Sequence, residues 1–118
     1  MKKVQLVNVT RGLVVASEVL VADGIFSRMK GLLGRSGLES SEGLWITPCN
    51  SIHMFGMRFP IDALFLSKEK LGVKMVGGLQ VGEMLWPVWS AYSVVELKSG
   101  RLVETGCHEG DKFDLLPC

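Results

Sequence analysis

Short runs of apolar and β-branched residues, each ended within a few positions by Gly or Pro, recur along most of the chain. Runs of this length are typical of strands, because helices need a longer stretch of 3.6-residue periodicity. We expect strands over residues 3–9, 13–22, 43–47, 51–55, 61–67, 73–76, 92–97 and 112–116. Arg11-Gly12 separates the first two, which we expect to form a hairpin.

One segment, residues 24–34, changes to helical spacing. Its apolar residues fall on one helical face: Ile25, Met29, Leu32 and Leu33. Asp23 is expected to cap the first turn and Gly34 to end the helix. A second, short helix is expected to begin at Ser99 and to end at Gly106.

These elements predict an α+β fold, mainly β, as a single compact domain over residues 1–118. About eight short strands would form a bent sheet or a partly open barrel with one or two short helices. The 14 glycines suit the bulges and corners of such a sheet, and 47% apolar residues suffice for its core.

Charge and targeting signals exclude several classes of function. Thirteen Lys and Arg against 12 Asp and Glu leave a formal charge of +1, so we expect neither nucleic-acid nor membrane binding. The longest stretch without these residues, 43–57, is too short and too polar to span a bilayer. No apolar segment of a secretory signal follows Lys3, and three cysteines make a poor disulfide framework. We therefore expect a cytoplasmic protein with reduced thiols.

Residues of chemical interest gather between positions 48 and 62. Asp62 is unexpected on an apolar strand, and it could bind a ligand or act as a general acid or base. The structural alternative, which we favour, is a carboxylate that accepts backbone amide protons or pairs with Arg28, Arg35 or Arg58.

His53 is the side chain best suited by type to be a general base or a metal ligand near neutral pH. The alternative is a histidine that is merely hydrogen-bonded on its strand. Strand alternation places Phe55 on the same face as His53.

Two catalytic constellations can be written down, and neither has the spacing of its class. Cys49, His53, Cys107 and His108 could bind zinc, but adjacent residues of a strand point to opposite faces. A nucleophilic triad of Cys49, His53 and Asp62 lacks a nucleophile-elbow sequence. We therefore expect no metal and no cofactor.

An aromatic cluster runs from Trp86 to Tyr92 on an expected loop. Such side chains can stack on a ligand or dock on a protein partner, and they can equally cover the core of a small domain, which we favour.

Together these features favour a binding or accessory module for a small molecule or a peptide over a hydrolytic or metal-assisted enzyme. The expected site residues are Arg28, Arg35, His53, Phe55, Arg58, Asp62 and Trp86. Nothing in the sequence indicates an oligomeric state.

Four blocks carry a family resemblance: Gly31–Arg35, Pro60–Asp62 followed by Phe65, Glu96-Leu97 with Gly100, and Gly110-Asp111. In this order they resemble the bacterial and archaeal "domain of unknown function 192" family, also called UPF0127, over about residues 12–115. The resemblance implies a small β-rich single domain and brings no established reaction, substrate or cofactor.

The chain also departs from the family pattern. Arg28 and Arg35 match the two arginines of the helix block, whereas His53 stands where many members have Trp. Phe55 and Gly56 stand where many members have Lys-Asn. A site built on that Lys-Asn pair would therefore be absent or different here.

Overall fold

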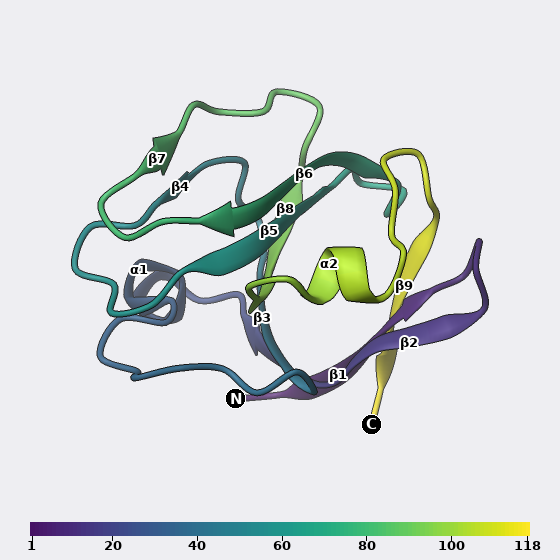
Figure 1. Cartoon of the computed structure of the whole chain (residues 1–118), viewed down its shortest axis with the longest axis horizontal. Helices are drawn as coiled ribbons and strands as arrows, with labels where there is room; N and C mark the ends of the chain where they lie inside the picture. The colour runs from purple at the N-terminus through teal and green to yellow at the C-terminus, as the bar shows by residue number, and fades with distance from the viewer.

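The computed structural model describes residues 1–118 and contains nine strands and two helices (Figure 1). The elements in chain order are β1 (Lys3–Asn8), β2 (Leu13–Ala22), α1 (Ile25–Lys30), β3 (Glu42–Ile46), β4 (Ile52–His53), β5 (Ile61–Leu66), β6 (Gly72–Leu79), β7 (Met84–Leu85), β8 (Ser93–Lys98), α2 (Arg101–Glu104) and β9 (Phe113–Pro117).

Seven strands form one curled sheet in the order β6-β5-β8-β3-β2-β1-β9, and β4 and β7 pair in a small second sheet. All neighbours in the large sheet are antiparallel except β2 and β3. The two edge strands of this sheet are β6 and β9. Leu71, just before β6, forms a β-bridge with Lys112, just before β9, so the sheet curls into a half-barrel. The expected α+β, mainly β fold and the β1–β2 hairpin are confirmed.

Strands β5 and β8 lie side by side and are buried on both faces, apart from Lys98 at the end of β8. Each face belongs to a separate apolar core. Leu64 packs in one core with Leu102 of α2, whereas Ala63 packs in the other with Ile52 of β4. Side chains that alternate along these two strands therefore point towards different parts of the molecule.

Asp62 on β5 is fully buried, and its carboxylate binds three backbone amides. Its Oδ1 accepts hydrogen bonds from the N–H groups of Gly78 (2.9 Å) and Gly100 (3.0 Å), and its Oδ2 accepts one from Leu102 (2.9 Å). The carboxylate thus joins β5 to the end of β6 and to the start of α2. Asp62 therefore has the structural role that we favoured from the sequence: its carboxylate accepts backbone amide protons. It does not pair with an arginine.

Helix α1 is shorter than the expected segment, residues 24–34. The chain leaves helical geometry at Gly31, whose φ of 49° favours glycine, and the N-cap is Gly24 rather than Asp23. No side chain of α1 is buried, so Ile25 and Met29 do not pack into the core as the apolar face predicted. One turn and a half of helix at the surface is too short to cover a core.

Smaller differences concern local caps and short strands. Helix α2 is capped by Gly100 rather than Ser99, and it ends at Glu104, with Thr105 as its C-cap, rather than at Gly106. Strand β4 is only two residues long, and its partner β7, Met84–Leu85, lies where no strand was expected. A two-residue strand has too few positions to show an alternating pattern.

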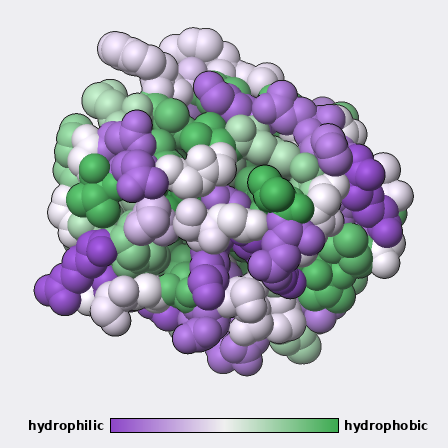
Figure 2. All heavy atoms as spheres, viewed as in Figure 1, coloured by the Kyte–Doolittle hydropathy of each residue, from purple (hydrophilic) through white to green (hydrophobic).

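The surface mixes polar and apolar side chains in the view of Figure 2, where apolar residues emerge as several small groups. Neither helix has the length and hydropathy that a membrane-spanning helix requires.

The contacts of Asp62 predict a large loss of stability when its carboxylate is removed. Asp62→Ala leaves three N–H groups without their acceptor, of which that of Leu102 is buried and costs about 1–3 kcal/mol by itself. Asp62→Asn presents an amide N–H group to one of the two oxygen positions, and should lower the free energy of unfolding by about 1–3 kcal/mol. Urea denaturation measures both variants.

The matched control is Asp23→Asn, an exposed carboxylate with no hydrogen bond in the structure, expected within about 0.5 kcal/mol of wild type. If Asp62→Asn proves as stable as this control, the structural role of Asp62 is refuted.

Candidate functional site

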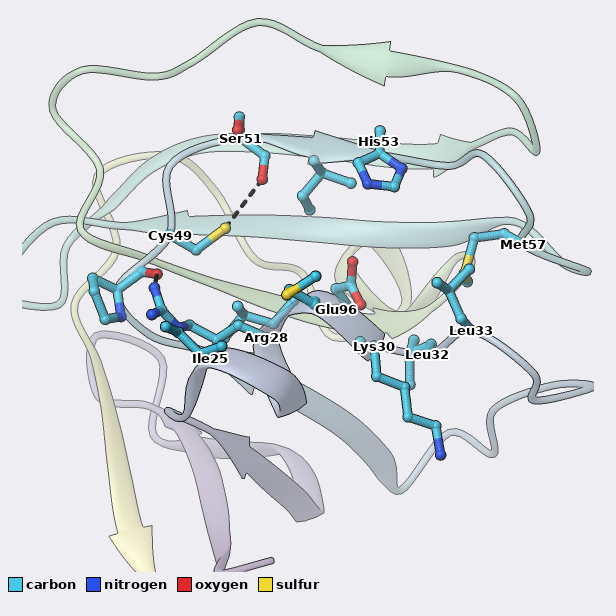
Figure 3. A pocket seen from close by; sticks show the side chains of 15 residues that line it. Ile25, Arg28, Lys30, Leu32, Leu33, Cys49, Ser51, His53, Met57 and Glu96 are labelled. Carbon is cyan, nitrogen blue, oxygen red and sulfur yellow. Dashed lines mark hydrogen bonds between the residues drawn. The ribbon is translucent and has the colours of Figure 1, made fainter.

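A cavity of about 320 Å³ is lined by residues of α1, β4 and β8 and of the loop after β3 (Figure 3). Its volume is at the lower end of the range of small-molecule sites. The rim consists of exposed residues such as Met29 and His53, whereas deeper lining residues such as Ile46 and Ile52 are buried. The cavity therefore opens to solvent and has an apolar interior.

Glu96 of β8 projects into this cavity and is 5% exposed. Its Oε1 atom is buried without a hydrogen-bond partner. The residues opposite Glu96 on the neighbouring strands are Leu44 and Ala63, which offer no donor. Burial raises the pKa of the Glu96 carboxyl to about 7.

The backbone passes close to this carboxyl where α1 ends. A Cβ atom at Gly31 would lie 3.9 Å from Oε1 of Glu96. The turn at Gly31 therefore closes one side of the cavity directly against the carboxyl. The N–H of Gly31 is bonded to the carbonyl oxygen of Ser27, so it does not serve Glu96.

Arg28 lies at the edge of the cavity on α1. Its guanidinium donates to the carbonyl oxygen of Pro48 (3.2 Å), which joins α1 to the loop after β3, and to that of Gly24 (3.4 Å), the N-cap of α1 itself. Neither acceptor is charged, and no carboxylate of the chain forms an ion pair with Arg28.

Cys49 lines the same cavity, and its thiol donates to the carbonyl oxygen of Ser51 at 3.1 Å. Burial raises the pKa of the Cys49 thiol, and the nearby Glu96 carboxyl adds to that rise, whereas the backbone of Ser51 and the charge of Arg28 oppose it. The net effect keeps Cys49 protonated, so it is not an activated nucleophile.

His53 is exposed at the rim, and its ring stacks on Phe55 with centroids 5.4 Å apart. The stacking confirms that these two side chains share a face, as strand alternation predicted. Phe55 itself is not among the residues that line the cavity.

Of the seven residues predicted from sequence, only Arg28 and His53 line the cavity. Arg35 lies elsewhere, 3.3 Å from Glu42, and Arg58 is exposed. Asp62 is occupied by the backbone amides on the opposite side of the large sheet.

The Trp86–Tyr92 segment does not cover the core with its tryptophans, which was the favoured expectation. Trp86 is 79% exposed and Trp89 is 84% exposed, whereas Val88 and Ala91 of the same segment pack on the core. Smaller residues of the loop cover the core, and the indole rings remain free.

The structure separates the members of both catalytic constellations. Cys107 packs against the core that contains Leu102 of α2, whereas Cys49 packs against the other core and lines the cavity with His53. No group of three or more His, Cys, Asp or Glu side chains is arranged to hold a metal ion.

Glu96 is the residue that the site prediction missed. A charged residue between Val95 and Leu97 on a buried strand was a signal of the same kind as Asp62 between Ile61 and Ala63. What distinguishes the two is the set of partners, and that depends on the folded structure.

The fold and the cavity define a small α+β half-barrel domain with a pocket into which the buried carboxyl of Glu96 projects. A model of the DUF192 family, described as an uncharacterised ACR, matches residues 6–115, and the chain belongs to this family. No curated protein matches the chain.

Two solved structures share the fold. A protein of unknown function from Novosphingobium aromaticivorans has a TM-score of 0.81 at 21% identity, covering 95% of this chain and 83% of the other. A protein named a "putative transcription regulator" from Sinorhizobium meliloti has a TM-score of 0.82 at 18% identity, covering 97% and 92%.

The raised pKa of Glu96 predicts a characteristic dependence of stability on pH. The unfolded chain releases this proton near pH 4.5, and the folded protein holds it until about 7. Over this interval the folded state binds more protons, so the free energy of unfolding should fall by about 3 kcal/mol as pH rises. Glu96→Gln should remove this fall.

Urea denaturation at a series of pH values measures the effect. The pKa values of Glu42 and Asp111 are lowered in the folded protein. These two carboxylates therefore stabilise the fold at a pH above their usual pKa values, and this stabilisation is lost only as pH falls below about 4.5. They therefore act outside the interval assigned to Glu96. Identical pH profiles for wild type and Glu96→Gln would contradict the assignment.

Proposed function

We propose that this domain is a binding module that takes a small polar molecule into the cavity beneath α1, with Glu96 as its main polar contact. The single observation that supports this function is the buried, unpaired Oε1 of Glu96 at an open cavity. A buried carboxyl without a partner lowers stability, so its presence is best accounted for by a group that arrives from outside.

The chemistry of the carboxyl suits a ligand with hydrogen-bonding groups. A carboxyl with a pKa of about 7 can donate a proton to an acceptor or, once ionised, accept from a donor. Apolar side chains around it lower the local dielectric constant, which strengthens either interaction. The ligand would therefore combine a polar end with an apolar body.

Binding is preferred to hydrolysis because the residues for nucleophilic catalysis do not meet. Cys49 stays protonated as a thiol. Asp62 lies on the opposite face of the sheet from the cavity, whereas His53 lines that cavity. The proposed site therefore retains Arg28 and His53 from the sequence prediction and replaces Asp62 with Glu96.

The same proposal includes a reducing compartment such as the cytoplasm. All three cysteines are free, and Cys49 lies in the proposed site, where oxidation would change its lining.

A fragment screen by amide NMR tests the proposal. The probes are small amines, amides, alcohols and carboxylic acids, each added to wild type, Glu96→Gln and the control Glu69→Gln. We expect at least one class to shift the amides of Gly31, Cys49 and His53 in wild type and in the control. Glu96→Gln should weaken that binding by about tenfold, because it removes a charge-assisted hydrogen bond.

Glu69 is an exposed carboxylate on the turn between β5 and β6, away from the cavity. The proposal fails if no probe class shifts the cavity amides, or if every hit binds Glu96→Gln as well as wild type.

A further inference from the structure

Two charged groups of opposite sign line the cavity, and neither has a charged partner within the chain. The Glu96 carboxyl lies at the floor with an unpaired oxygen. The Arg28 guanidinium lies at the edge and is bonded only to neutral carbonyl oxygens. These bonds use two of the five N–H donors of arginine, so three remain for a ligand.

The Cys49 thiol lies within the electrostatic reach of both groups. Its proton affinity responds to Glu96 and to Arg28, in opposite directions. Figure 3 shows Cys49 on the same side of the cavity as Arg28, with the Glu96 carboxyl directed into the space between α1 and β4. Because Arg28 and Glu96 line the same cavity of about 320 Å³, we infer that one small molecule in it can reach both charged groups.

The other charged and titratable residues of the cavity form no ion pair with Glu96 or Arg28. Lys30 of α1 lines the cavity, but its side chain extends away from Glu96 in Figure 3. His53 of β4 is held at the rim by its stacking on Phe55. The lining of the cavity is otherwise largely apolar and includes Met29, Leu33, Ile46, Ile52 and Met57.

We propose that the ligand is a small zwitterion, an amino acid whose ammonium group binds Glu96 and whose carboxylate binds Arg28, with methylene groups between them. This inference rests on the proposed function and assigns its ligand class. An ammonium group would supply the donor that Oε1 lacks, and a carboxylate matches the planar donor array of arginine. The methylene groups would lie against the apolar wall.

Ligands with a single charge satisfy only half of the site. An alkylamine leaves Arg28 without a counterion, and an alkanoate leaves the buried Glu96 unpaired. The zwitterion should therefore bind more tightly than either compound of the same chain length, which makes the assignment testable.

The experiment is isothermal titration of the whole chain with 4-aminobutanoate, 5-aminopentanoate and 6-aminohexanoate, above the pH of about 7 at which Glu96 ionises. The matched alkylamines and alkanoates are titrated beside them. We expect the best zwitterion to bind at least about tenfold more tightly than its amine or acid counterpart. Glu96→Gln and Arg28→Gln should each weaken it by about tenfold, and Arg58→Gln, an exposed control, should not.

The alkylamine separates the two charge contacts, because its binding should depend on Glu96 and not on Arg28. The inference is overturned if no zwitterion of the series binds, if none binds more tightly than its amine, or if Arg28→Gln leaves its affinity unchanged. In each of these cases a fragment whose binding depends on Glu96 would leave the proposed function standing, whereas the absence of any such fragment would remove both.

Discussion

The carboxylate of Asp62 fixes the part of the fold on which the cavity depends. It binds backbone amides at the end of β6, in the turn after β8 and at the start of α2, and it is fully buried. These contacts tie three segments of the chain to β5 and leave neither oxygen of Asp62 unpaired. Because Asp62 pairs with Leu97 across β5 and β8, the same register places Ala63 opposite Glu96. The side chain of Glu96 is thereby directed to the opposite face of the sheet.

The neighbouring strands β5 and β8 therefore carry two buried carboxyls in opposite situations. Asp62 faces the α2 side, where three N–H groups converge on it. Glu96 faces the cavity, where its cross-strand neighbours Leu44 and Ala63 are apolar. Backbone donors compensate the desolvation of Asp62, whereas nothing in the chain compensates that of Glu96. This contrast distinguishes a carboxylate that builds the fold from one that is free to bind.

The lengths of the apolar runs and the spacing of Gly and Pro were enough to predict a bent sheet of short strands. They could not reveal β7, which is two residues long, nor the early end of α1 at Gly31. Arg28 and His53 could be found by residue type, but the position of Asp62 and Glu96 relative to the cavity could not. Both are acidic residues in apolar strands, and only strand register and the course of α2 decide which one finds donors.

The central claim is that the Glu96 carboxyl is buried, unpaired and directed into an open cavity. Its titration can be followed through the side-chain carboxyl carbon by NMR, with the resonance assigned from its absence in Glu96→Gln. The structure predicts a midpoint at about 7, well above the ordinary value of 4.5 for glutamate. A midpoint near 4.5 would show that the carboxyl is solvated or paired, and would contradict the account.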